Sequence, residues 1–230
     1  MYAGLISSVV IFDNDLLRNI KGIRESQELF DDLTENPGDF MVAYAAESRD
    51  TEPTDQALIS RPFDYGMAIT FPFIQANWQR TRFSAGNNYG AWYGSLELET
   101  TIYESAYHWR RFVLDSFSPV VGDIIADRRV VKARCRGILV SLLGKEIDYP
   151  ALIDPDDYAF TNELGAYMKN QNQNGLLVRS ARCLGTNAAL FTPSILNNAC
   201  DHCFLTYTLT PSVNDTIRVE REPGKLLMFV

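Results

Sequence analysis

Apolar residues recur with a helical period in two parts of the chain. Between residues 97 and 116 the successive intervals are four, four, three and four, which places Leu98, Ile102, Ala106, Trp109 and Val113 on one stripe of an amphipathic helix. Residues 14–36 show a similar pattern until Asn36-Pro37-Gly38 interrupts it. Two helices are therefore expected, one over 97–116 and one over 14–36.

Other segments have the composition of strands. Residues 65–73 and 175–178 are short apolar runs, and Gly90 to Gly94 is an aromatic run bracketed by glycines, which suits a buried strand. From residue 131 to 136 apolar residues alternate with Lys132, Arg134 and Arg136, which predicts a strand with one basic face.

A further helix is expected to begin at residue 154. The sequence Asp154-Pro155-Asp156-Asp157 combines an aspartate cap, a proline in the first helical position and acidic residues in the first turn. Its end is expected near residues 170–174. This mixture of helices and strands in 230 residues predicts one α+β domain, in which a helical N-terminal region (1–59) packs on a core domain (60–230).

Composition narrows the functional classes. The net charge of −8 disfavours non-specific binding to nucleic acid, because an acidic surface repels phosphate. No apolar run reaches the ~18–20 residues of a membrane helix, and the start of the chain lacks the basic segment of a secretory signal. The four cysteines are too few and too unevenly spaced for a disulfide framework. A cytoplasmic protein is therefore expected.

Three residues at equal intervals form the first candidate site. Arg82, Tyr93 and Glu104 are eleven residues apart, on an expected loop, strand and helix. Such a trio suits a dinucleotide, because arginine binds pyrophosphate, an aromatic ring stacks on a base, and a carboxylate stabilises a developing cation. His108 follows Glu104 by four residues and so lies on the same helix face. The alternative is an exposed arginine, a core tyrosine and a solvated glutamate.

Two further groups of residues could carry chemistry. Ser180 follows an expected strand and is close to Arg179 and Arg182, but no Gly-x-Ser-x-Gly sequence surrounds it and the chain has only two histidines, so a hydrolase triad is disfavoured. Cys200 and Cys203 have the spacing of half a zinc site. Buried thiols are the favoured interpretation, and no metal is expected.

The segments around Arg82 and Ser180 carry a resemblance to a known family. RFSAGNNYGAWYGSLELETTIYESAYH and DYAFTNELGAYMKNQNQNGLLVRSARCLGTNAALFTPS resemble the RES domain, found in many bacterial toxin–antitoxin systems. The resemblance implies a fold with an ADP-ribosyltransferase-like mixed β core and peripheral helices, and a reaction that consumes NAD. It makes Arg82, Tyr93, Glu104 and Ser180 the catalytic candidates.

The family also has an arginine on its first strand. The expected counterpart of that strand, Tyr2 to Ile11, contains none. By its interval from Arg82 the nearest substitute is Arg61, and Arg80 is the second. Arg61, His108 and Arg182 are accordingly assigned to binding NAD.

The resulting expectation is an NAD-consuming enzyme that cleaves the nicotinamide–ribose bond, with NAD as its substrate. Glu104 is expected to face the developing cation, Arg82 the pyrophosphate and Tyr93 the nicotinamide, while Ser180 contacts the nicotinamide side or the acceptor. The acceptor stays open: water (a glycohydrolase), phosphate (a phosphorolase) or a protein (an ADP-ribosyltransferase). An inactive binding module and a metal-dependent protein also stay open. The resemblance implies an antitoxin that covers the cleft, and the oligomeric state is left open, a homodimer included.

Overall fold

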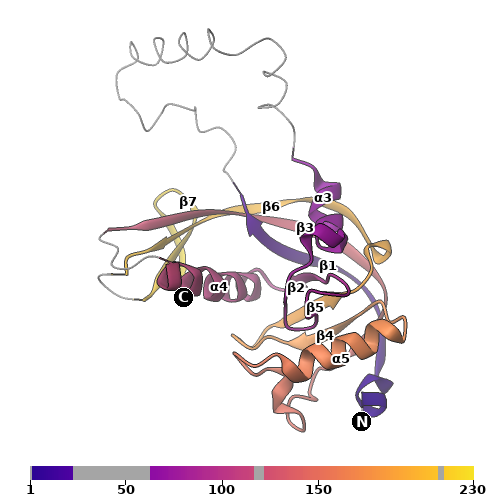
Figure 1. The fold of residues 1–230 in the computed structure, drawn as a ribbon. Coiled ribbons are helices and arrows are strands. Elements are labelled where there is room, and N and C mark those ends of the chain that lie inside the picture. Colours follow the sequence, from indigo (N-terminus) through magenta and orange to yellow (C-terminus); the bar gives the residue numbers. More distant parts are fainter. Residues whose placement is uncertain (1, 23–62, 117–121, 212–214) are drawn as a thin grey trace, which may run out of the picture. The chain divides into compact units, whose positions relative to one another are not determined.

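The computed structural model describes residues 2–22, 63–116, 122–211 and 215–230 (Figure 1). Residues 2–22 and 65–230 belong to one compact unit. Its strands are β1 (Val9–Lys21), β2 (Trp92–Ser95), β3 (Ile124–Ser141), β4 (Gly175–Arg179), β5 (Thr186–Leu190), β6 (Leu196–Leu209), β7 (Ile217–Glu222) and β8 (Lys225–Phe229). The α-helices are α3 (Tyr65–Thr70), α4 (Leu98–Ser116) and α5 (Ala159–Asn170), and the 3₁₀ helices are η1 (Tyr2–Ser7), η2 (Phe71–Phe73), η3 (Gln75–Asn77), η4 (Pro150–Leu152) and η5 (Pro193–Ile195). The expected α+β class is confirmed.

Five strands close into a ring. The sheet order is β1-β2-β5-β4-β3-β6-β7-β8, and β1 also pairs with β3 along its whole length, from Val9 opposite Val140 to Lys21 opposite Arg128. All five strands of the ring contribute to a single apolar cluster: Phe12, Leu16, Trp92, Ala133, Cys135, Leu139, Leu177, Ala188 and Leu190. Because these residues alternate along their strands, the cluster fills the inside of the ring.

Two other clusters cover the outside of the ring. The predicted stripe of α4 is buried against β1, β3, β6 and β7, where Ile102 and Val130 are fully enclosed. The second cluster joins α5 and η1 to β4 and β5 through residues such as Leu164 and Leu176. Each fully buried aliphatic side chain contributes about 1.5–3 kcal/mol by its removal from water. The two helices therefore pack on different strands: α4 on β1, β3, β6 and β7, and α5 on β4 and β5.

The helix expected over residues 14–36 is wrong where the structure describes it. Residues 9–21 form β1, because both edges of this segment find partners, β2 on one side and β3 on the other. Its pattern was ambiguous: Leu16 and Leu17 are both buried, one inside the ring and one under α4. The hydrogen bonds that this segment forms with β2 and β3 make it a strand, although its apolar residues have a helical spacing. Residues 23–36 and the boundary at 59/60 lie outside the described residues.

Two smaller expectations are also wrong. Residues 65–73 form α3 and η2 instead of a strand, and the indole N–H of Trp92 donates to the carbonyl of Ala68, 3.0 Å away. The helix expected from Asp154 begins at Ala159. Asp154 instead accepts hydrogen bonds from the backbone N–H groups of Asp156 and Asp157, so its cap closes a turn and not a helix. The end of α5 at Asn170 and the other expected elements are confirmed.

Candidate active site

The side chain of Glu104 extends from the face of α4 opposite the buried stripe. Two hydrogen bonds hold its carboxylate. The Ser180 hydroxyl donates to Oε1 over 2.6 Å, and the side-chain amide of Asn187 donates to the same oxygen over 2.6 Å. The Ser95 hydroxyl in turn donates to Oδ1 of Asn187, also over 2.6 Å. Side chains from β5 and from the residue after β4 thus meet at one oxygen of Glu104, and a side chain from β2 holds the Asn187 amide.

Hydrogen bonds to the backbone also fix the position of Ser180. Its side chain is buried, and its Oγ accepts hydrogen bonds from the backbone N–H groups of Arg182 (3.0 Å) and Cys183 (3.3 Å). Its own N–H donates to the carbonyl of Gly185. Because a hydroxyl has one proton and two lone pairs, these partners direct the proton of Ser180 to Glu104.

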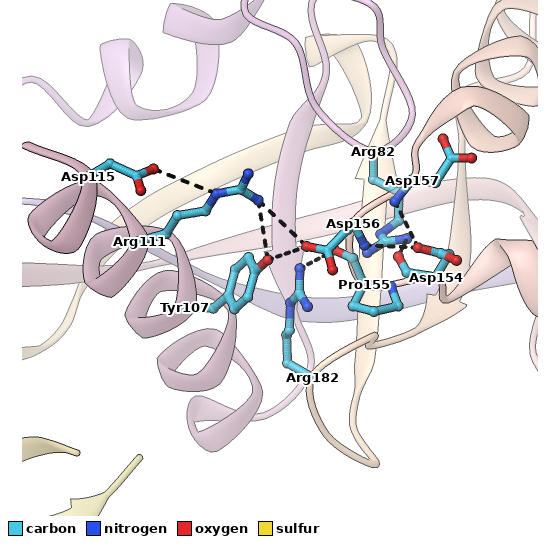
Figure 2. A network of polar contacts seen from close by, with 9 residues as sticks. All are labelled: Arg82, Tyr107, Arg111, Asp115, Asp154, Pro155, Asp156, Asp157 and Arg182. Carbon is cyan, nitrogen blue, oxygen red and sulfur yellow. Dashed lines mark hydrogen bonds and ion pairs between the residues drawn. The ribbon is translucent and has the colours of Figure 1, made fainter. Parts of the chain in front are cut away.

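Arg82 and Arg182 both contact the segment 152–158, of which Figure 2 shows residues 154–157. Nη1 of Arg82 donates to the carbonyl of Asp154 over 2.6 Å, and its guanidinium lies 4.5 Å from the ring centroid of Tyr158. Nη2 of Arg182 donates to the carbonyl of Pro155. The two arginines therefore meet one loop from two sides.

The ring of Tyr107 connects this loop to α4. The guanidinium of Arg182 lies 3.3 Å from the ring centroid, a cation–π contact. The Tyr107 hydroxyl donates to Oδ1 of Asp156 over 2.7 Å, and Arg111 lies 3.5 Å from the same oxygen (Figure 2). The backbone N–H groups of Asp157 and Asp156 lower the pKa of Asp154, with Arg82 and Arg182 adding to the effect. The loop is thus acidic and is held by cations.

The electrostatics of His108 show which charged groups share its surroundings. Loss of hydration lowers the pKa of His108; Arg182, Arg82 and Arg111 lower it further, while Glu104 opposes them. A cation is disfavoured near other cations, so the ring stays neutral at pH 7. The charges of Glu104, Arg82 and Arg182 are thus all felt at His108.

Tyr93 lies on the same strand face as Ser95, two residues away. Its hydroxyl accepts a hydrogen bond from the backbone N–H of Phe83 over 2.6 Å, next to Arg82. Burial raises the pKa of Tyr93 well above its ordinary value, against the opposing effects of that N–H and of Arg82. The phenol is thus neutral and joins β2 to the turn that carries Arg82.

The arginine that the family carries on its first strand has no counterpart beside Glu104 among the described residues. Arg61 lies outside the described residues, and Arg80 is exposed. The prediction that the first strand lacks arginine is wrong, because β1 extends to Lys21 and includes Arg18. The Arg18 guanidinium, however, lies 5.4 Å from the ring centroid of Trp92, inside the ring of strands. The face of β1 nearer to Glu104 is that of Leu17, which pairs with Ser95.

Other features that the sequence singled out lie apart from this cluster. Cys203 is buried as the sequence favoured, whereas the expectation of a buried thiol is wrong for Cys200, which is exposed. Lys132, Arg134 and Arg136 line a hollow of about 670 Å³ that shares no residue with the Glu104 cluster. Their charges are paired with Asp13 and Asp15. None of the described helices is both long and apolar enough to cross a membrane.

Sequence reasoning missed Asn187, Ser95, Tyr107 and the loop at Asp154–Asp157. Asn187 follows Gly185 and Thr186 and so looked like part of a turn. A partial signal was available for Ser95, which follows Tyr93 by two residues and so lies on the same face of the strand.

Comparisons with known proteins place this chain in a family. The model of the RES domain matches residues 56–210. No curated protein matches the chain. A solved structure from M. tuberculosis, the MbcT–MbcA toxin–antitoxin complex, is similar with a TM-score of 0.46 and 11% sequence identity, over 87% of this chain and 92% of that one. Because the family model spans well over half of the sequence and includes Arg82, Tyr93, Glu104 and Ser180, this chain belongs to the RES domain family.

Proposed function

We propose that this protein consumes NAD by breaking its nicotinamide–ribose bond, and that it is the toxin of a toxin–antitoxin pair. The observation that carries the chemistry is the carboxylate of Glu104, one oxygen of which is fixed by Ser180 and Asn187. Its other oxygen receives no hydrogen bond from the part of the chain that the structure describes. A fixed carboxylate with one open oxygen is what a reaction through a cationic sugar requires.

The protein need not supply a nucleophile for this reaction. As nicotinamide departs with the electron pair of the glycosidic bond, positive charge develops over C1′ and the ring oxygen of the ribose. Only contacts that strengthen as this charge appears raise the rate. Glu104 supplies such a contact, and an acceptor then adds to C1′: water yields ADP-ribose and a proton, whereas phosphate yields ADP-ribose 1″-phosphate. A protein nucleophile as acceptor would make the protein an ADP-ribosyltransferase.

The cations of the site suit the pyrophosphate. Arg82 binds the loop through Nη1, so Nε and Nη2 remain for phosphate oxygens as far as the described residues go. Nε of Arg182 is buried and has no acceptor among these residues. The neutral ring of Tyr93 and the uncharged His108 fit beside a nicotinamide that is itself cationic. No step needs a metal.

The RES resemblance also supports the biological part of the proposal. It implies an antitoxin that covers the cleft, and the cytoplasmic location expected from the composition is one where NAD is available. An inactive binding module remains the main competitor, since the arginine that the family carries on its first strand has no described counterpart in this site.

Product analysis tests the proposal. Purified protein is incubated with NAD, with and without phosphate, and free nicotinamide and the ribose product are identified. Release of nicotinamide is expected, and Glu104→Gln should lower the rate by about 100-fold or more, the scale of one preorganised electrostatic group. Glu99→Gln, an exposed glutamate on the same helix, serves as control. NAD left intact by the unmodified protein, or equal rates for Glu104→Gln and the control, would overturn the assignment.

A further inference from the structure

We infer that Asn187 is a positioning residue for Glu104, and that Ser95 stabilises the orientation in which it acts. The inference rests on the proposed function, because it concerns the carboxylate to which that function assigns the central role. The evidence is a chain of three hydrogen bonds of 2.6 Å, from Ser95 to Asn187, from Asn187 to Glu104, and from Ser180 to the same glutamate oxygen.

The sheet fixes the first link of this chain. Ser95 and Asn187 are direct partners in the antiparallel pairing of β2 with β5, so their side chains lie on the same face. Ser95 is only 3% exposed. The pairing of β2 with β5 thus holds the Ser95 hydroxyl beside the Asn187 amide before any substrate is present.

An amide is suited to the position between Ser95 and Glu104. Oδ1 accepts the serine proton, which leaves the NH₂ group facing the carboxylate. With the amide turned over, Oδ1 would face the negative oxygen of Glu104 and repel it. The acceptor-only carboxylate of Glu104 therefore selects this orientation, and Ser95, which does not contact the glutamate, stabilises it by donating to Oδ1.

The two oxygens of the Glu104 carboxylate therefore have different roles. Oε1 is held by donors from two separate segments, the end of β4 and the start of β5, so the plane of the carboxylate is fixed. The other oxygen is then aimed without reorganisation during the reaction, which is how preorganised groups lower a barrier. Removing Asn187 should therefore lower kcat more than it alters the binding of NAD.

The kinetic test uses four variants. Asn187→Asp keeps the acceptor for Ser95 but replaces the donor by an oxygen, so kcat is expected to fall about 100-fold while KM for NAD changes less than about threefold. Ser95→Ala should lower kcat about tenfold, and Ser95→Thr, which keeps a hydroxyl, should recover most of that loss. Ser105→Ala, a nearby hydroxyl on α4 bonded to the carbonyl of Thr101, is the control and should leave kcat unchanged. A rise in KM with unchanged kcat in Asn187→Asp, or equal losses in Ser95→Thr and Ser95→Ala, would overturn the inference.

A spectroscopic test separates this inference from the proposed function, since it needs no turnover. In ¹⁵N spectra of the unmodified protein and of Glu104→Gln, the side-chain NH₂ signals of Asn187 are expected to differ. Those of Asn162, which donates to the carbonyls of Thr81 and Arg82, should coincide and serve as the internal control. An unmoved Asn187 signal refutes the positioning role whether or not NAD is consumed. A moved signal in a protein that leaves NAD intact refutes the proposed function alone.

Discussion

Arg82 combines two contacts that a lysine could not both replace. One nitrogen binds the carbonyl of Asp154, and the planar guanidinium lies over the ring of Tyr158. Arginine presents several donors in a rigid fork, whereas lysine is a single charge on a flexible stem. One edge of the fork can hold the loop while the other meets the pyrophosphate. The dual role depends on the shape of the group as well as on its charge.

We therefore expect Arg82→Lys to weaken NAD binding about tenfold or more, although the charge is kept. The matched control is Arg80→Lys, two residues earlier, where the arginine is exposed. Calorimetric titration with NAD, carried out in the Glu104→Gln background to prevent turnover, measures both affinities. Equal affinity for NAD in the two variants would show that Arg82 does not bind the pyrophosphate.

His108 offers a test of the local charges in the free protein. Its pKa lies below the ordinary value of about 6.5, because lost hydration and three arginines disfavour the charged ring more than Glu104 favours it. Well above pH 6.5 the ring is neutral in both folded and unfolded chains. As the pH falls, the unfolded chain takes up the proton first, so His108 lowers the free energy of unfolding in acid.

The chain has two histidines, and loss of hydration also lowers the pKa of His202. Both imidazole signals in a ¹H NMR titration are accordingly expected to move at a pH below 6.5, and His202→Gln assigns them. In addition, His108→Gln should lose less stability than the unmodified protein between pH 7 and pH 5. A His108 signal that titrates above 6.5 would mean that Glu104 outweighs the arginines.

At the scale of the element, α5 fixes the turn that carries Arg82. Asn162 donates to the carbonyls of Thr81 and Arg82, at 2.7 and 2.8 Å. One helical turn later, Gly165 lets the helix approach the backbone of Phe83: a Cβ added there would lie 2.2 Å from the carbonyl oxygen. The glycine is therefore needed for a close approach, and not for an unusual backbone angle.

Gly165→Ala tests that contact against helix propensity. Alanine in a helix is favoured over glycine by about 1 kcal/mol, so an open site would be stabilised. Overpacking costs about 1–3 kcal/mol and, against backbone, should prevail, which lowers Tm by roughly 2–4 °C per kcal/mol in a chain of this size. Gly4→Ala, where a Cβ meets nothing within 4 Å, is the control. Thermal unfolding measures both, and a Tm for Gly165→Ala at or above that of the unmodified protein would contradict the close approach.

The elements also show where sequence reasoning succeeds. The stripe of α4 was predictable because five apolar residues repeat over four turns, and the burial of Ile102 and Val113 follows from it. β1 was not predictable in the same way, since Leu16 and Leu17 are buried on opposite faces by different partners. Glu104 and Ser180 could be named because their sequence surroundings resemble a family. Asn187 could not, because its role arises from the register of β5 against β2.

At the scale of the whole molecule, a net charge of −8 contrasts with a site that gathers Arg82, Arg111 and Arg182 near His108. An overall negative surface repels anions, so binding of a dinucleotide must depend on the local cations. Residues 2–22 and 65–230 form one compact unit, which allows binding at the site to be measured through unfolding of that unit.

NAD should therefore stabilise the folded protein. A ligand that binds only the native state adds RT ln(1 + [L]/Kd), about 2.7 kcal/mol at a concentration of 100 Kd, which corresponds to a rise in Tm of roughly 5–11 °C. The measurement uses Glu104→Gln, in which NAD survives heating without turnover, and increasing NAD concentrations should raise Tm in proportion to their logarithm. Adding Arg82→Lys to this variant should move the whole curve to higher NAD concentration, because the pyrophosphate contact weakens. If millimolar NAD leaves Tm unchanged while ADP-ribose raises it, the site binds a product-like ligand and the order of events proposed for NAD is wrong. If neither ligand changes Tm, the cations around Arg82 serve only to hold the 152–158 loop.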